Sequence, residues 1–358
     1  MIYENVLQTI GNTPLIKLKS IAAEIPGTVI GKIESFNPGN SAKDRIALHM
    51  VNKAEKSGRL KPGGTLIEAT SGNTGYSLAM IATMKGYRCI LTLTSKASKE
   101  KISLLKSMGA EVLVCPANVT PEDPQSYYSR AEQLAREIPN SYYIAQNFNK
   151  DNAEAHYLTT GPEIWEATQG KITHYVCCAG TGGSLSGTAR YLKEQNPNIK
   201  VIGVDAYGSV LKKYWETGFY DKSEIYSYKV EGLGKNIIPD NLDVNYIDDF
   251  IKVTDRHSAM RARQLAKMEG LLMGFSSGAA MHAVFKIKNQ LKHKDVVVVL
   301  FPDHGSRYLG KIYNDEWMKQ QGYLPNRQIP SYGYTQIKKL YRSYKIKYHR
   351  YLKQNFKH

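Results

Sequence analysis

The chain has 358 residues, of which 42% are hydrophobic and 22% charged. This composition is too apolar for a disordered protein, and the length suits two domains or one large two-lobed domain. Lysine and arginine number 48 against 32 acidic residues, which points to nucleic acid, a membrane surface or an anionic ligand as partners. Nine of the basic residues lie in 327–358, where no acidic residue occurs. More than half of the excess charge therefore belongs to the C-terminal tail, and the body is only mildly basic.

Short apolar runs alternate with longer amphipathic segments along the body. Strands are predicted at 29–33, 65–68, 88–93, 111–115, 174–178, 201–205 and 296–301. Helices are predicted at 42–57, 75–85, 99–107, 125–137, 152–168, 184–195, 255–269 and 277–291. This alternation, with apolar strands that suit burial on both faces, indicates an α/β fold with mainly parallel sheets. No low-complexity linker separates two halves, so any two lobes must be closely interwoven.

The four cysteines are too few for a disulfide framework in a chain of this length. Adjacent Cys177 and Cys178 would point to opposite faces of a strand, which is poor geometry for a shared metal, and no metal site is predicted. No apolar run is long enough to span a membrane, and the N-terminus lacks the basic and apolar regions of a secretory signal. We therefore expect buried free thiols and a cytoplasmic protein.

The segment from about 331 to 356 differs from the body. Its apolar residues fall at roughly helical spacing between lysines and arginines: Ile337, Tyr341, Tyr344, Tyr348, Tyr351 and Phe356. This pattern predicts a basic amphipathic C-terminal helix. We expect it to pack on the body or on a second subunit, and contact with nucleic acid or a membrane is the alternative.

The first of four glycine-rich turns, 37–45, places Lys43 in the first turn of a helix, after Ser41 as a capping residue. The helix dipole disfavours a cation there and lowers the pKa of the amine, as a Schiff-base lysine requires. A solvated lysine is the alternative. The second turn, 68–76, offers backbone amides and the hydroxyls of Thr70, Ser71 and Thr74 to an anion such as a carboxylate. A capped strand–helix connection would also explain it.

The third turn, 179–187, follows an apolar strand and opens a helix, as a phosphate cradle does. A dinucleotide fingerprint with Asp205 as ribose acceptor is the rival, but Leu185 occupies its third glycine position. The fourth turn, 274–279, also opens a helix and is a weaker signal. A phosphate cradle, a lysine of low pKa and a carboxylate loop together point to pyridoxal phosphate acting on an amino acid.

The chain resembles the fold-type II pyridoxal-phosphate enzymes of the cysteine synthase and cystathionine β-synthase group. The resemblance runs from Ile10 to about Leu324. It rests on the segments 10–15, 37–45, 70–75, 159–164, 180–187 and 302–309, and on His156. It implies a two-lobed fold like that of the tryptophan synthase β subunit, each lobe a mainly parallel sheet flanked by helices. The catalytic unit would be 1–325, with a smaller mobile lobe at roughly 40–150, and 326–358 would be a basic tail.

The resemblance also implies a role for each matching residue. Lys43 would hold the cofactor as an internal aldimine, Asn73 would bind its ring hydroxyl, and Ser276 would face its pyridine nitrogen. The cofactor phosphate would be held by the loop that contains Gly180, Thr181, Gly182, Gly183 and Ser184. The substrate would be bound by Thr70, Ser71, Gly72, Thr74, Gln146 and Gly232. A homodimer is the family expectation.

The implied reaction is β-replacement in sulfur amino-acid metabolism. Lys43 would remove the Cα proton of serine or O-acetylserine, the β-substituent would leave to give an aminoacrylate, and a thiol or sulfide would add at Cβ. The Ser276 hydroxyl, unlike a carboxylate, would not keep the pyridine nitrogen of the cofactor protonated. The ring would then be a weaker electron sink, which favours rapid loss of the β-substituent.

Four segments resemble cystathionine β-synthase: 116–126, 207–211, 231–234 and 311–324. The segments 274–279 and 303–308 resemble cysteine synthase, and 146–150 departs from the usual pattern beside the substrate. We therefore expect a cystathionine β-synthase that condenses serine with homocysteine, with cysteine synthase as the alternative and a non-enzymatic binding protein as the remote one. Control by haem or S-adenosylmethionine is not expected, because the matching segments for those domains are missing.

Overall fold

The computed structural model describes residues 2–70, 72–120 and 122–325. The chain divides into two compact units, Met1–Tyr313 and Asn314–His358. The described part of the second unit contains one short helix, α11 (Asp315–Gln320), which is capped by the side chain of Asn314. The predicted basic helix at 331–356 lies outside the described residues. Within the described ranges, no helix combines the length and the apolar character that crossing a membrane requires.

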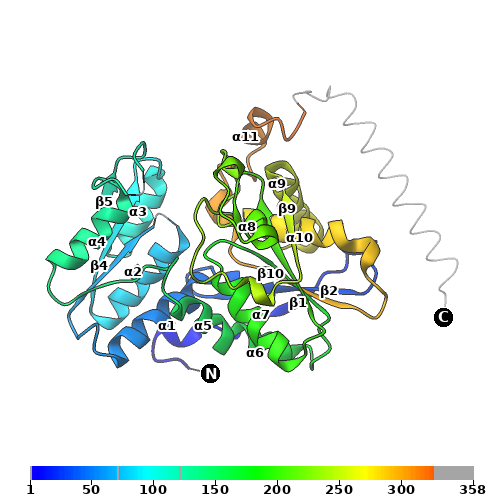
Figure 1. Ribbon diagram of the computed structural model, residues 1–358, viewed down its shortest axis with the longest axis horizontal. Helices are drawn as coiled ribbons and strands as arrows, with labels where there is room; N and C mark the ends of the chain where they lie inside the picture. The colour runs from blue at the N-terminus through cyan, green and yellow to red at the C-terminus, as the bar shows by residue number, and fades with distance from the viewer. Residues whose placement is uncertain (1, 71, 121, 326–358) are drawn as a thin grey trace. The chain divides into compact units, whose positions relative to one another are not determined.

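The first unit is built on two sheets, and the larger one has six strands in the order β1-β2-β10-β7-β8-β9 (Figure 1). These strands are β1 (Leu15–Lys17), β2 (Thr28–Ile33), β7 (His174–Cys178), β8 (Lys200–Ala206), β9 (Asp249–Val253) and β10 (Val296–Phe301). All neighbouring strands are parallel except β1 and β2. The four-stranded sheet, in the order β5-β4-β3-β6, is parallel throughout. Its strands are β3 (Thr65–Ala69), β4 (Arg88–Thr94), β5 (Glu111–Cys115) and β6 (Ser141–Tyr143).

Helices cover both faces of each sheet. The small lobe, which is the four-stranded sheet with its helices, contains α1 (Lys43–Lys56), α2 (Asn73–Lys85), α3 (Lys99–Ser107) and α4 (Tyr127–Glu137). The large lobe contains α5 (Asp151–Leu158), α6 (Thr160–Ala167), α7 (Gly183–Gln195), α8 (Leu211–Thr217), α9 (Asp255–Gln264) and α10 (Phe275–Ile287). α6, α7 and α8 pack with one face of the large sheet, and α10 lies against β7, β9 and β10, with α9 packed against α10.

Alternation along the strands explains how the small sheet is covered. Leu66 and Leu91 join the buried cluster that includes α1 and α2, whereas their neighbours Ile67 and Ile90 pack with α4. Successive strand residues point to opposite faces, so a strand covered on both sides must be apolar throughout. The predicted α/β fold with two interwoven lobes of mainly parallel sheet is confirmed.

The elements that were not predicted are the short ones. β1, β6 and β9 have three to five residues and form sheet edges, and α8 has seven residues. The helix predicted at 152–168 is two helices, because Thr159 between α5 and α6 leaves the helical region at φ −127°. The helix predicted at 255–269 changes to a π-helical turn after Gln264.

A buried ion network joins the start of α1 to the large lobe. The Arg45 guanidinium contacts the Glu34 carboxylate at 2.6 Å and the Glu163 carboxylate at 2.6 Å, and Lys32 contacts Glu163 at 2.5 Å. Burial by itself would raise the pKa of Glu34, but the charge of Arg45 and its hydrogen bond outweigh this effect and hold that pKa at about 2. The network thus connects β2, α1 and α6 through fully paired charges.

We predict that Arg45→Met destabilises the protein by about 3–5 kcal/mol at neutral pH, because it leaves the buried Glu34 carboxylate without its partner. Urea unfolding followed by circular dichroism measures the loss. Arg88→Met is the matched control, because Arg88 pairs with Glu111 on the surface. If Arg45→Met lowers the free energy of unfolding no more than the control does, the ion network does not contribute to stability as predicted.

Candidate active site

Lys43 is the first residue of α1, directly after the glycine-rich turn. Its backbone N–H donates to the Ser41 hydroxyl at 3.3 Å, whereas its side-chain amine makes no hydrogen bond or ion pair with the described residues. Burial lowers the pKa of this amine, and the nearby Cys177, Asp303 and Glu34 oppose the shift. Burial therefore favours a neutral, reactive amine here.

Each of the four glycine-rich turns ends at the start of a helix whose capping residue offers no side chain to it. The prediction that Ser41 is the capping residue of α1 is wrong, because Ala42 holds that position, although the Ser41 hydroxyl accepts the Lys43 N–H. The capping positions of α1, α2, α7 and α10 are Ala42, Gly72, Gly182 and Gly274, and in the described part of the chain none has a side chain bonded to the helix. By contrast, Ser98, Ser126 and Thr254 cap α3, α4 and α9. The first N–H groups of a helix lack intrahelical partners, so the uncapped starts can bind anions.

The predicted phosphate loop packs tightly against its neighbours. Gly182 has the left-handed φ of +89°, and a Cβ added there would lie 2.6 Å from the backbone nitrogen of Leu242. A Cβ at Gly183 would lie 2.0 Å from the Asn152 Oδ1 atom. Only glycine fits at these two positions, and the loop therefore presents backbone rather than side chains at the start of α7.

A chain of hydrogen bonds connects the predicted carboxylate loop to the phosphate loop. The Thr74 hydroxyl donates to Gln146 Oε1 at 2.7 Å, and the Gln146 amide donates to Glu68 at 3.0 Å. Asn152 Nδ2 donates to the Gln146 carbonyl at 2.8 Å and to the Thr181 hydroxyl at 3.0 Å. Thr74 and Gln146 are buried and bonded to each other. Thr70, in the same turn as Thr74, is also buried, and Gly72 is exposed. Ser71 lies outside the described residues.

Ser276, Gly232 and Gly180 lie together on the large lobe. A Cβ at Gly232 would lie 3.6 Å from the Ser276 hydroxyl, and one at Gly180 would lie 2.7 Å from the Gly232 carbonyl. The Cys178 thiol donates to the Ser276 carbonyl at 3.2 Å, while Cys177 contacts the Ser184 hydroxyl at 3.8 Å. The adjacent cysteines thus contact two different helix starts, at Ser184 and at Ser276. All four cysteines are buried free thiols, as predicted.

Four polar residues had no role assigned from the sequence: Asp303, Tyr308, Glu68 and Lys235. Asn73 Nδ2 donates to the Asp303 carboxylate at 2.9 Å, and the Tyr308 hydroxyl donates to the same carboxylate at 2.7 Å. Burial raises the pKa of Glu68 to about 8, and burial with the charge of Lys43 lowers the pKa of Lys235 to about 8. A carboxyl group inside a parallel strand was the one available signal for Glu68.

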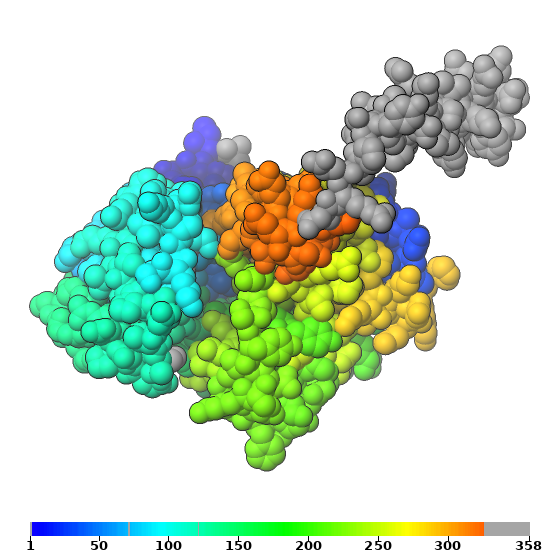
Figure 2. Space-filling view, turned by 90° about the horizontal axis from the view of Figure 1, so that it is seen from above, coloured from blue at the N-terminus to red at the C-terminus, as the bar shows by residue number. Residues whose placement is uncertain are grey.

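Glu231 forms an ion pair between the two lobes. Its carboxylate lies 2.7 Å from the Lys101 ammonium of α3 and also pairs with Lys311. Figure 2 shows a furrow between the cyan surface of the small lobe and the green surface of the large lobe. Glu231 precedes Gly232, so this pair connects α3 to the loop that lies beside Ser276.

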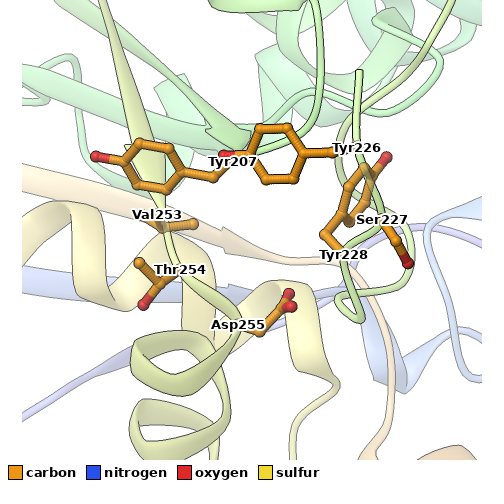
Figure 3. A pocket seen from close by; sticks show the side chains of 7 residues that line it. All are labelled: Tyr207, Tyr226, Ser227, Tyr228, Val253, Thr254 and Asp255. Carbon is orange, nitrogen blue, oxygen red and sulfur yellow. The ribbon is translucent and has the colours of Figure 1, made fainter. Parts of the chain in front are cut away.

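A separate open hollow of about 310 Å³ lies on the large lobe (Figure 3). It is lined by Tyr207, Tyr226, Ser227, Tyr228, Val253, Thr254 and Asp255. The Asp255 carboxylate accepts hydrogen bonds from the backbone N–H groups of Lys229 and Val230 at 2.8 and 2.9 Å. This carboxylate therefore fixes the backbone segment directly before Glu231. None of the predicted site residues lines the hollow.

The residues present fit pyridoxal phosphate. The unpartnered amine of Lys43 is available to its aldehyde, and the uncapped start of α7 suits a phosphate dianion. The amide of Asn73 and the buried Ser276 supply polar groups for the ring. Within the described ranges, no cluster of three His, Cys, Asp or Glu side chains could hold a metal ion.

We predict that the stability of the protein falls as pH rises from about 4.5 through about 8, because folding keeps Glu68 protonated while the unfolded carboxyl ionises near its ordinary pKa of about 4.3. In Glu68→Gln this contribution disappears. Urea unfolding of both proteins at pH 5, 7 and 9 should show wild type losing, relative to the variant, on the order of a few kcal/mol. Parallel pH profiles for the two proteins would refute the assignment.

Comparison with known proteins gives consistent results. The model of the family described as "Pyridoxal-phosphate dependent enzyme" matches residues 6–303. A cystathionine β-synthase of Apis mellifera is 45% identical over 325 residues, which cover 90% of this chain and 64% of that protein. An O-acetylserine dependent cystathionine β-synthase of Bacillus subtilis is 38% identical, and the match covers 86% of this chain and 96% of that protein.

A solved structure is also similar. The hydrogen sulfide-producing enzyme of Fusobacterium nucleatum superposes with a TM-score of 0.78 at 34% identity, and the match covers 88% of this chain and 99% of that one. The chain spans only 57–64% of the length of several cystathionine β-synthases that it matches.

Proposed function

Because the chain belongs to the family of pyridoxal-phosphate dependent enzymes, we propose that it catalyses β-replacement on serine or O-acetylserine in sulfur amino-acid metabolism, as a cystathionine β-synthase acting with homocysteine. The observation that carries the proposal is the half-buried Lys43 amine, which has no partner in the described structure and a lowered pKa. An amine in this state is a nucleophile toward a carbonyl group and a base toward a carbon acid.

Bound pyridoxal phosphate supplies an electron sink for negative charge that develops at Cα of the amino acid. The chain's own residues do the rest. Lys43 accepts the Cα proton, and the β-substituent leaves with its bonding electrons. The thiol of the second substrate loses its proton, which neutralises the departed group, and the thiolate sulfur bonds to Cβ while Lys43 returns the first proton to Cα. The uncapped start of α2 offers backbone N–H groups to the substrate carboxylate and so orients the amino acid, while the Thr74 hydroxyl in that turn is held by Gln146.

The choice of homocysteine rests on sequence similarity. The relatives named cystathionine β-synthase from Apis mellifera and Saccharomyces cerevisiae are 45% and 44% identical, whereas a cysteine synthase of Neurospora crassa is 38% identical. Glu231, which pairs with Lys101 and Lys311, is one of the residues that resemble cystathionine β-synthase. The cysteine synthase reaction, with O-acetylserine and sulfide, is the second candidate because of that relative and the sulfide-producing structural neighbour.

The purified protein should form cystathionine from serine and homocysteine. Mass spectrometry measures the products of all four combinations of serine or O-acetylserine with homocysteine or sulfide. Turnover of O-acetylserine with homocysteine but not of serine would assign the acetyl leaving group. Fast cysteine formation from sulfide with no cystathionine from either donor would overturn the lead in favour of cysteine synthase.

Lys43→Ala should abolish the visible absorbance of the cofactor-loaded protein and reduce turnover by at least about 10³-fold, because the variant lacks both the covalent attachment point and the base. Lys53→Ala is the matched control on the same helix, since the Lys53 ammonium lies on the surface and pairs with Asp151 and Glu154. Unchanged turnover in Lys43→Ala would contradict the proposal.

We also infer a homodimer and a cytoplasmic location with a role in transsulfuration. Four buried free thiols suit a reducing compartment, which supports the location. The predicted basic helix of the tail supplies a further surface for a second subunit. Light scattering of the full chain and of a chain ending at Leu324 measures the oligomeric state and the tail's part in it.

A further inference from the structure

Asp303 is a buried carboxyl group at which three parts of the site meet. It follows β10, and only 2% of its surface is exposed. Its backbone pairs with Ser41, two residues before Lys43, and its carbonyl accepts the N–H of Gly274 at the start of α10. Its carboxylate accepts the amide of Asn73 at the start of α2. No role in the reaction has been derived above for this residue.

The carboxylate determines which end of the Asn73 amide faces the site. A carboxylate can only accept hydrogen bonds, so the amide group must present Nδ2 to Asp303, at 2.9 Å. That nitrogen carries two hydrogens, and one of them remains available. Without the carboxylate, the amide could turn by 180° and present its carbonyl oxygen instead. A carbonyl oxygen would repel the phenolic oxygen of a bound pyridoxal ring, because both atoms are acceptors.

The surroundings of Asp303 are shaped to keep this carboxylate in place. The Tyr308 hydroxyl donates to the same oxygen, Oδ2, at 2.7 Å. The other oxygen, Oδ1, is buried without a partner among the described atoms, and it lies 1.7 Å from where a Cβ of Gly274 would stand. Any side chain at Gly274 would displace Asp303. A buried carboxylate oxygen with no donor is costly, which argues for a role beyond folding.

We propose that Asp303 is a positioning residue that holds the Asn73 amide with its N–H toward the phenolic oxygen of the cofactor, an inference that rests on the cofactor site of the proposed function. Burial raises the pKa of Asp303, and the hydrogen bonds from Asn73 and Tyr308 lower it and so keep the acceptor form available. The positioning would tighten cofactor binding and set the electronic state of the ring.

The test compares cofactor-loaded wild type with Asp303→Ala, Asp303→Asn, Asn73→Ala and the double variant Asp303→Ala/Asn73→Ala. The readouts are the position of the visible absorption band and the dissociation constant of pyridoxal phosphate. Asp303→Ala should shift the band and weaken binding at least about tenfold, the usual effect of losing a hydrogen bond to a charged group. Asp303→Asn keeps an acceptor oxygen and should recover a large part of the loss.

The double variant separates positioning from folding. If Asp303 acts through Asn73, its removal should have little further effect in the Asn73→Ala background, whereas a merely structural role gives additive losses. Tyr308→Phe is the matched control, since it removes the other donor and leaves the Asn73 contact; its binding should change less than about threefold. Additive losses, or an unshifted band in Asp303→Ala, would overturn the inference.

The outcome is distinct from failure of the proposed function. If wild type itself shows no visible cofactor band that depends on Lys43, the proposed function fails and the Asp303 variants have no band to compare. If that band is present and Asp303→Ala leaves it unchanged, the positioning role alone is rejected. Thermal unfolding of each variant without added cofactor identifies any that do not fold. If Asp303→Ala does not fold, Asp303→Asn and Tyr308→Phe still test the proposal.

Discussion

The rest of the structure depends on the pairing of the Arg45 guanidinium with two buried carboxylates, Glu34 and Glu163. An unpaired charge inside a protein is so costly that these groups have essentially one acceptable arrangement. Because Arg45 lies two residues after Lys43, the arrangement determines where α1 begins relative to β2 and α6. The amine to which we assign the chemistry is therefore positioned by the ion pairs of Arg45, although it has no partner of its own in the described structure.

The site combines this lysine with helix starts that no side chain satisfies. Among the described residues, no side chain caps the starts of α2 and α7, and the partial positive charge of a helix start suits a carboxylate or a phosphate. The nearby buried acids are held by amides: Glu68 by Gln146 and Asp303 by Asn73. Burial raises the pKa of Glu68 to about 8, so this carboxyl group orients the neutral Gln146 amide without adding full negative charge beside the anion sites.

Much of the fold could be predicted because its central strands are apolar on both faces and its turns contain glycine. The bounds of β5, β7 and β10 agree with the prediction to the residue. The strand β6 has only three residues, of which one is buried, so its sequence is too short to show a pattern of its own. The Asn73–Asp303 contact joins residues 230 positions apart, and local patterns contain no information about such pairs. The glycine turns predict where the cofactor site lies, whereas the contacts of the polar residues Asp303 and Glu68 are known only from the structure.

The position of β10 has a consequence for how the chain is made. β10 is the last strand among the described residues, yet it lies between β2 and β7 in the large sheet. During synthesis, β2 and β7 leave the ribosome long before the strand that separates them, so each has an unpaired edge until Phe301 has emerged. Unpaired edges of apolar strands recruit other chains. A nascent chain that stalls before Val296 therefore exposes two such edges, and assistance from chaperones matters most at that stage.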